Sequence, residues 1–348
     1  MKVSVVEFCE KNENYILDID KQLLSSGNQM VYYSSGFISF LKTIMSGSEF
    51  YYVTVTDNDK LLGLLPFALK INGGCTVLNS LPFYGSYGGP LVLSKEKEAD
   101  IINLLLKGYF GFADEVKADL ANFIENPLQP INQDDSINKE FEKIDERIGQ
   151  FTEFPEQQSN LEETLMSIFH SKTRNMIRKG EKTKLSIELK DDDAAFEWLH
   201  SEHTKSILSL GGLPKALTVF SALKSSFGND CELYIGKANG EPVCGVLIIL
   251  YAQTIEYFTP VVKDEWRESQ VLSALIYRIM LKMIGRGYKQ WNWGGTWLSQ
   301  EGVYRFKKRW GSVDHPYGYY SRRTSDKIIS IPLEQLQRDF PFYYLYKY

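Results

Sequence analysis

A short cluster of cations and aromatic rings has the residue types for chemistry at a carbonyl group. It reads Phe306-Lys307-Lys308-Arg309-Trp310. A cation beside a carbonyl carbon under attack stabilises the oxyanion that forms there. Phe306 and Trp310 lie four residues apart, so on a helix both rings would face the core and fix the cations between them. A cation of this cluster is therefore a catalytic candidate, and the alternatives are that it binds phosphate or lies on the surface. The neighbouring candidates for substrate contact are Tyr304, Arg305 and Arg309.

A second cluster, Lys172 to Lys184, carries six basic side chains and one acid, Glu181. Arg174 and Arg178 are four residues apart and would share one face of a helix. Two guanidiniums on one face can hold a diphosphate, as in a nucleotide sugar or a lipid pyrophosphate, or a tRNA phosphate. The alternative is a solvated basic helix. Arg174, Arg178 and the intervening Asn175 are therefore predicted substrate contacts.

Two histidines, His200 and His203, lie three residues apart on a predicted helix from Ala194 to Leu210. A facing histidine pair can ligate a metal ion. No third protein ligand lies at a useful spacing, so we predict no metal site. A surface between domains or along a substrate groove is the expected environment of this pair.

Two other polar candidates lie beside aromatic or glycine residues. Tyr87 precedes Gly88-Gly89, which permit close approach of the backbone to a ligand. A tight turn into Pro90 needs the same residues, and both interpretations remain open. Asn292 lies between two tryptophans that are expected in the core, and its amide is a candidate for facing a site.

Two β-hairpins, one in each half of the chain, are predicted to help position these residues. Tyr51–Val55 and Leu61–Leu65 flank a polar turn, and Leu233–Gly236 and Val243–Leu247 flank Asn239-Gly240. Asn-Gly between apolar runs is a strong hairpin signal. An aromatic helical patch precedes each hairpin, at residues 37–42 and 220–224. One constant offset places Tyr52 on Tyr234 and Gly63 on Gly245, which favours an internal duplication.

The second half continues with a predicted strand from Thr254 to Val262 and a helix from Gln270 to Arg286. Apolar residues recur along that helix at helical spacing. Trp291–Trp293 then forms a short strand. Strands and helices in this order predict an α+β fold.

An acidic segment punctuated by Pro127, Pro130 and Pro155 separates the two halves. Such composition is typical of a linker. A chain of 348 residues also favours two domains. We therefore predict domains at residues 1–155 and 156–348, with the active site in the second.

Composition restricts the class of protein. The net charge of -5 argues against a general binder of polyanions. Four widely separated cysteines indicate neither a disulfide framework nor a zinc knuckle. The first residues lack the apolar stretch of a signal peptide, and the longest apolar run, residues 243–252, is too short to span a bilayer. A soluble, cytoplasmic protein is expected.

Three segments carry a family resemblance. Residues 80–90, ending Tyr87-Gly88-Gly89-Pro90, resemble a strand ending in the first lobe of the FemAB-like acyltransferases. Residues 172–182 are similar to the basic helix that opens the second lobe of that family. Residues 294–311, containing Gly302-Val303-Tyr304-Arg305-Phe306-Lys307, resemble its C-terminal block. The three segments occur in the order that the family shows.

The resemblance implies two tandem acetyltransferase-like lobes, each a mixed, mostly antiparallel sheet flanked by helices. It also implies peptide-bond formation on a cell-envelope precursor, peptidoglycan or a related surface glycan, with aminoacyl-tRNA or acyl-CoA as co-substrate and no tightly bound cofactor. Lys307 is implied in stabilising the oxyanion. His200 and Thr204 lie in a stretch that resembles the family and are candidate substrate contacts.

The loop Trp266–Val271 bears on the donor. Acetyltransferases that use coenzyme A place a glycine-rich turn here, whose N–H groups hold the pyrophosphate at a helix N-terminus. This loop has Arg267, a candidate substrate contact, but no glycine. We therefore expect a donor other than simple acetyl-CoA. An acyl-CoA-dependent N-acyltransferase acting on an amino sugar and a non-catalytic glycan- or RNA-binding module are the alternatives. The partners that the resemblance implies are an envelope precursor, tRNA and, peripherally, the membrane.

Overall fold

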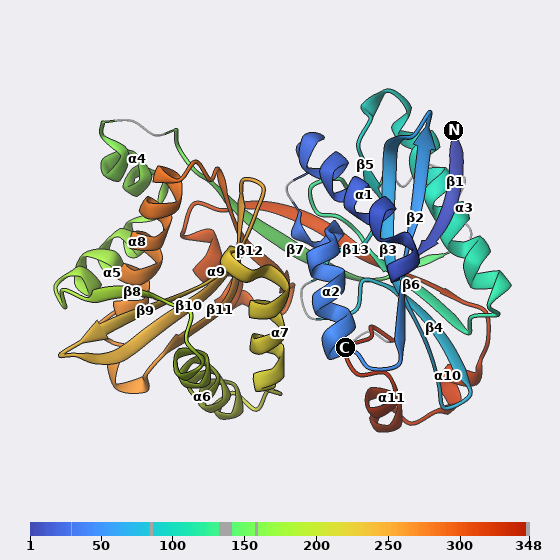
Figure 1. The fold of residues 1–348 in the computed structure, drawn as a ribbon. Coiled ribbons are helices and arrows are strands. Elements are labelled where there is room, and N and C mark those ends of the chain that lie inside the picture. Colours follow the sequence, from blue (N-terminus) through green and yellow to red (C-terminus); the bar gives the residue numbers. More distant parts are fainter. Residues whose placement is uncertain (29, 84–85, 132–140, 157–158, 346–348) are drawn as a thin grey trace. The chain divides into compact units, whose positions relative to one another are not determined.

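The computed structural model describes the chain except for residues 29, 84–85, 132–140, 157–158 and 346–348. Tyr84 of the predicted glycine-rich loop lies outside the described residues. The chain forms two compact units (Figure 1): unit 1 comprises Met1–Ile148 and His315–Tyr348, and unit 2 comprises Gly149–Asp314. The segment after Asp314, which the predicted boundary near residue 155 assigns to the second lobe, groups with unit 1.

Unit 1 is built on a mixed sheet of order β1-β2-β3-β4-β6-β13, in which β4 and β6 run parallel and the other neighbouring strands named here pair antiparallel. Asn58 and Asp59 adopt φ of 49° and 64° in the turn between β2 and β3. A tight hairpin turn requires such positive values, and the predicted hairpin is confirmed. The strands are β1 (Lys2–Glu7), β2 (Ser48–Asp57), β3 (Lys60–Asn72), β4 (Cys75–Ser80), β6 (Leu120–Ile124) and β13 (Val313–Arg323), with β5 (Leu91–Val92) paired to β3.

One helix, α3 (Glu98–Glu115), connects the parallel strands of unit 1 and packs on one face of its sheet. Ile101, Leu105 and Tyr109 of this helix are fully buried against the strands. Burying side chains of this size contributes about 1.5–3 kcal/mol each, which fixes the helix on the sheet. The other helices of unit 1 are α1 (Glu13–Ser25), α2 (Ser35–Ile44), α10 (Lys327–Ser330) and α11 (Leu333–Asp339).

Unit 2 has a sheet that includes strands in the order β12-β11-β10-β9-β8. The hairpin turn between β9 and β10 places Asn239 and Gly240 at φ of 52° and 82°, as the Asn-Gly signal predicts. β11 and β12 are parallel, and their pairing ends at Glu256 and Asn292 although both strands continue. The strands are β8 (Ser186–Lys190), β9 (Cys231–Ala238), β10 (Glu241–Tyr251), β11 (Thr254–Val262) and β12 (Gln290–Trp297). β7 (Glu142–Glu153) lies beside β12 and has residues 149–153 in unit 2.

The predicted helix after β11 is α8 (Val271–Gly285), whose apolar residues form much of the core of unit 2. α5 (Ser171–Glu181) packs on it, and α6 (Asp193–Ser209) contacts β11. A Cβ on Gly180 of α5 would lie 2.3 Å from the backbone oxygen of Gln270, so the two helices approach very closely. The remaining helices are α4 (Leu161–Ile168), α7 (Leu217–Phe227) and α9 (Glu301–Lys308).

The internal duplication is visible in the order of the elements. Apart from short 3-10 turns and the two-residue β5, both units contain a run of strand, helix, helix, three strands, helix, strand, from β1 to β6 in unit 1 and from β8 to β12 in unit 2. The last two strands of each run are parallel. This is the predicted α+β fold class. The offset read from the sequence is wrong by one residue, because Asn58 and not Asp57 occupies the turn position of Asn239. A shift of one residue moves every side chain of a strand to the opposite face of its sheet. The residue of unit 1 that corresponds to Tyr234 is therefore Val53, not Tyr52. Val53 belongs to the core against α3, and Tyr234 to the core against α8.

Among the described residues, no helix has the length and apolar character needed to cross a membrane.

Candidate active site

Lys307 lies on α9 and is only 7% exposed, which is unusual for a lysine. The rings on either side anchor the helix: Phe306 and Trp310 pack against Trp293 with centroids 5.9 and 5.6 Å apart. Trp310 is fully buried. The four-residue spacing of Phe306 and Trp310 therefore gives the anchored geometry that the sequence suggests.

The ammonium group of Lys307 is surrounded by neutral acceptors. Its Nζ donates to the carbonyl oxygens of Gly294 at 3.1 Å and Gly295 at 3.0 Å, and to Thr296 Oγ1 at 2.8 Å. Among the described residues, no carboxylate forms an ion pair with it. Burial lowers the pKa of Lys307 to about 7, because the charged form loses hydration. Gly294 adopts a φ of +72°, which favours glycine and presents these carbonyls to the lysine.

Behind Lys307 lies a network of polar side chains. Thr296 Oγ1 donates to Gln150 Oε1 at 3.1 Å, and Gln150 Nε2 lies 3.4 Å from Asp314 Oδ1. Tyr304 donates its hydroxyl proton to Asp314 Oδ2 at 2.8 Å. Tyr304 is thereby connected to the surroundings of Lys307, whereas Lys308 points to the same aspartate from the exposed side of α9.

A buried carboxylate, Glu256, lies where β11 and β12 cease to pair. It is 4% exposed and accepts a hydrogen bond from Asn292 Nδ2 at 2.7 Å. Asn292 Oδ1 in turn accepts the N–H of Gly294 at 2.8 Å, and the carbonyl of Gly294 accepts from Lys307. The carboxylate and the ammonium are therefore linked through the segment 292–294.

Glu256 was not among the predicted site residues. The available signal was a single charged residue within the apolar run Thr254–Val262, since a charge inside a buried strand needs a specific reason. A carboxylate can accept a proton and a cation can stabilise an oxyanion, and both functions serve amide-bond formation.

Arg174 and Arg178 line one open hollow of about 650 Å³, together with Glu162, Glu163 and Tyr277. Arg174 Nη1 donates to the carbonyl of Phe169 at 2.6 Å, and Arg178 Nη1 lies 3.4 Å from Asn175 Oδ1. The two guanidiniums thus share a face, as their spacing predicts. The nearby carboxylates oppose phosphate binding, and the phosphate role remains a prediction.

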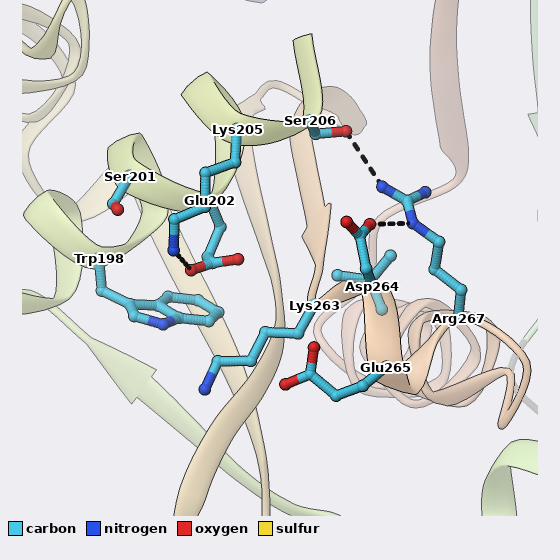
Figure 2. Close-up of a pocket in the computed structure, with 10 residues that line it drawn as sticks. Trp198, Ser201, Glu202, Lys205, Ser206, Lys263, Asp264, Glu265 and Arg267 are labelled. Carbon is cyan, nitrogen blue, oxygen red and sulfur yellow. Dashed lines mark hydrogen bonds and ion pairs between the residues drawn. The ribbon is translucent and has the colours of Figure 1, made fainter. Parts of the chain in front are cut away.

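Arg267 borders a second hollow of about 450 Å³ between α6 and the loop that precedes α8 (Figure 2). Its Nε pairs with Asp264 at 2.6 Å, and its Nη2 donates to Ser206 Oγ at 3.3 Å. Lys205 pairs with Glu202 at 2.7 Å in the same hollow, so these opposite charges compensate each other (Figure 2). The close contact of Gly180 with Gln270 also brings α5 against the start of α8, where coenzyme A pyrophosphate would need open N–H groups.

Both histidines of α6 form hydrogen bonds with neighbouring groups. His200 Nε2 lies 3.3 Å from Thr204 Oγ1. His203 Nε2 accepts the backbone N–H of Lys215 at 3.1 Å, and burial lowers the pKa of His203 to about 4. Lys215, which was not predicted, lies 5.4 Å from the ring of Phe258, and burial lowers its pKa to about 8. No cluster suited to a metal ion occurs in the described part of the chain.

Tyr87, Arg305 and Arg309 are the remaining predicted contacts. Tyr87 belongs to unit 1 and is fully buried between Tyr32 and Tyr317, each with its ring centroid 5.0 Å away. Arg305 is exposed and pairs with Glu301 at 3.2 Å. Arg309 is half-buried. Gly88 and Gly89 approach protein backbone, since a Cβ on either would lie within 3 Å of residues 80–81 or 124–125. Substrate roles for Tyr87, Arg305 and Arg309 remain predictions.

Residues 169–308 match the family model described as Acetyltransferase (GNAT) domain. No curated protein matches the chain in sequence. Solved structures match it in fold. FemX has a TM-score of 0.72 at 13% identity, covering 97% of this chain and 99% of FemX. A tandem GNAT protein from the clavulanic acid biosynthesis pathway has a TM-score of 0.53 at 9% identity, with 93% and 99% covered.

A third similar structure is the C-terminal domain of a putative lysylphosphatidylglycerol synthetase from Agrobacterium fabrum. Its TM-score is 0.51 at 11% identity, and the match covers 91% of this chain and 97% of that one. The predicted FemAB-like tandem acetyltransferase fold is thus confirmed by FemX and the tandem GNAT protein. The residues that match the GNAT model, 169–308, lie within unit 2.

Proposed function

We propose that this acyltransferase forms an amide bond between an acyl or aminoacyl group and an amine of a cell-envelope precursor, peptidoglycan or a surface glycan. The similarity in fold to FemX and to a putative lysylphosphatidylglycerol synthetase supports an envelope acceptor. The observation that carries the proposal is Lys307, a buried cation with neutral partners, linked through residues 292–294 to the carboxylate of Glu256.

The transfer proceeds directly from donor to acceptor. The acceptor nitrogen attacks the donor carbonyl while Glu256 accepts the amine proton. The tetrahedral oxyanion forms beside Lys307, which stabilises the negative charge. Collapse re-forms the carbonyl and expels the donor's oxygen or sulfur, which takes a proton. Lys307 is assigned as catalytic on this basis, with Asn292 positioning Glu256 and the backbone of Gly294.

The donor is an aminoacyl-tRNA or an acyl-CoA that acts as co-substrate. Arg174, Arg178 and Asn175 on α5 are proposed to contact phosphates of the donor or acceptor, and Tyr304, His200, Thr204 and Arg267 to contact substrate. Reaction with a nucleotide- or lipid-pyrophosphate precursor would take place in the cytoplasm, with peripheral contact to the membrane when the acceptor is lipid-linked. The second lobe, from about residue 156, is proposed to carry the reaction.

An intact-mass assay that pairs charged tRNAs and acyl-CoAs with amine-bearing envelope precursors tests this function. We expect an acceptor product heavier by one acyl or aminoacyl group. Lys307→Met should lower its rate by a factor of about 100 or more. Lys308→Met removes an exposed neighbouring cation on the same helix and is the matched control, which should retain most of the activity. No product with any pair, or equal rates for both variants, would contradict the proposal.

A second candidate is an acyl-CoA N-acyltransferase that modifies an amino sugar of a surface polysaccharide. The GNAT match favours it, whereas the glycine-free loop and the packing of Gly180 against Gln270 oppose it. Calorimetry with acetyl-CoA separates the two, because tight binding supports this candidate and its absence supports another donor. A protein that binds glycan or RNA without making any product would indicate the non-catalytic alternative.

A further inference from the structure

The parallel strand pair of unit 1 carries two buried asparagines at matched positions. Asn79 of β4 lies opposite Asn122 of β6, and they are 0% and 2% exposed. The segment that follows α11 approaches this pair. Asn79 Oδ1 accepts the backbone N–H of Tyr344 at 3.4 Å, and the carbonyl of Tyr344 accepts from the side-chain amides of Asn79 and Asn122. Two buried amides therefore bind the peptide groups of a single residue.

The side chain of Tyr344 is also held. Its hydroxyl donates to the carbonyl of Phe83 at 2.8 Å. Its ring meets Tyr319 edge-on at 5.2 Å, and the guanidinium of Arg147 lies 5.7 Å from its centre. One residue before, at Tyr343, the hydroxyl donates to Ser48 at 3.0 Å. The main chain is fixed as well, since Phe83 donates its N–H to the carbonyl of Phe342 at 2.9 Å.

This arrangement is a site for an extended peptide with an aromatic residue. It recognises the backbone through Asn79 and Asn122, the ring through Tyr319 and Arg147, and the hydroxyl through Phe83. Asn122 Oδ1 is buried and has no hydrogen-bond partner in the described part of the chain. A buried acceptor without a partner is costly, so an incoming ligand with an additional N–H would bind there more favourably than Tyr344 alone.

The duplicated unit gives an independent reason to regard these positions as a site. Glu256 and Asn292 are the last paired residues of β11 and β12, and we place the reaction beside them. The buried amides of unit 1 occupy the corresponding element pair, β4 and β6. In unit 1, this polar pair binds a segment of the chain itself.

We propose that unit 1 contains a peptide-binding site centred on Asn79 and Asn122, and that the segment Phe342–Leu345 is its resident ligand. Its natural competitor is a peptide of the same chemistry, an extended segment bearing an aromatic residue. This proposal is independent of the transfer reaction.

Hydrogen exchange on the full-length chain tests the contact. Replacing both asparagines, Asn79→Leu with Asn122→Leu, should speed exchange of the amides of residues 342–345 about tenfold, because hydrogen bonds that hold them are lost. Asn103→Leu on α3 is the control, since the side-chain oxygen of Asn103 has no partner in the described structure and this segment does not contact it through any hydrogen bond there. Equal exchange in the double variant and the control would overturn the proposal.

Binding of a labelled peptide that copies residues 340–348 tests the site itself, again with full-length protein. Tyr344→Ala weakens the resident segment, and this variant should bind the peptide saturably and at least tenfold more tightly than the wild type. Adding Asn79→Leu and Asn122→Leu to Tyr344→Ala should abolish binding. A peptide carrying Tyr344→Ala should bind weakly. If the wild type and the Tyr344→Ala chain bind equally, or neither binds, the site does not exist.

Discussion

At the scale of single residues, the central feature is a lysine whose charge is stabilised by dipoles rather than by a carboxylate. Three oxygens surround the Nζ of Lys307, and each is neutral. A carboxylate partner would hold the proton firmly and neutralise the field of the ammonium. Without one, the cation remains available to a negative charge that appears during the reaction.

The pH dependence of stability tests this burial. The pKa of Lys307 is lowered from 10.5 to about 7 in the folded chain, so the unfolded chain binds more protons between these values. Folding stability therefore rises with pH across that window. Urea unfolding at pH 6, 8 and 10 measures this. Relative to Lys307→Met, the free energy of unfolding of the wild type should rise by roughly 1 kcal/mol or more from pH 6 to pH 10. A difference that does not change with pH would contradict an uncompensated buried ammonium.

Glu256 provides a second prediction at this scale. Glu256→Gln keeps the shape of the side chain and an oxygen for Asn292 but cannot accept a proton, so transfer should fall by about 100-fold or more while the fold persists. Glu232→Gln is the matched control, because Glu232 is a buried carboxylate of unit 2 that binds Arg286 and Tyr234. Its rate of transfer should change little. Equal losses in both variants would remove Glu256 from the mechanism.

Of these two residues, Lys307 is indicated by the family resemblance, whereas Glu256 is not among the residues predicted from the sequence. The family resemblance points to Lys307, and the spacing of Phe306 and Trp310 predicts how its helix is anchored. Glu256 was not predicted, because Asn292, which orients it, lies 36 residues away and reaches it only when β11 and β12 pair. Likewise the charges beside Arg174 come from α4, and no local pattern places Glu162 and Glu163 in that hollow.

At the scale of elements, the contact between α5 and α8 depends on a glycine. A Cβ on Gly180 would also lie 2.8 Å from the Cβ of Ala274. Gly180→Ala should therefore push the helices apart and destabilise unit 2 by about 1–3 kcal/mol, despite the gain in helix propensity. Gly285→Ala, at the end of α8 with no atom within 4 Å, should be neutral or stabilising. Thermal unfolding of both variants measures this, and equal melting temperatures would contradict the close contact.

The elements themselves were largely predictable, because their signals are local. The two hairpins, α2, α5, α6, α8 and β11 follow from turn residues and periodicity. The residue offset between the two units was not predictable. Two apolar strands align almost as well when one is displaced by one position relative to the other. The pairing of β13 with β6 had no local signal at all, as almost 200 residues separate Tyr319 from its partner Ile124.

At the scale of the whole molecule, the thiols report on the integrity of both units. Cys75, Cys231 and Cys244 are buried, whereas Cys9 is half-buried. Burial raises the pKa of Cys231 and Cys244 to about 12, which suppresses the reactive thiolate. A thiol reagent should modify one cysteine quickly in the folded chain and four after denaturation. Cys9→Ser should abolish the fast phase, and rapid reaction of all four thiols in the folded chain would contradict this core.

Unit 1 is assembled from two separated stretches of the chain, whereas unit 2 is continuous. The ribosome delivers residues in order, and domains generally fold as they emerge. Unit 2 can therefore complete its core while residues 1–148 still lack β13 and the segment that carries Tyr344. Until those arrive, β6 has an unpaired edge, and exposed edges invite pairing with other chains. During synthesis, the half of the molecule made first is thus the last to be finished, and the nascent chain depends most on chaperones in that interval.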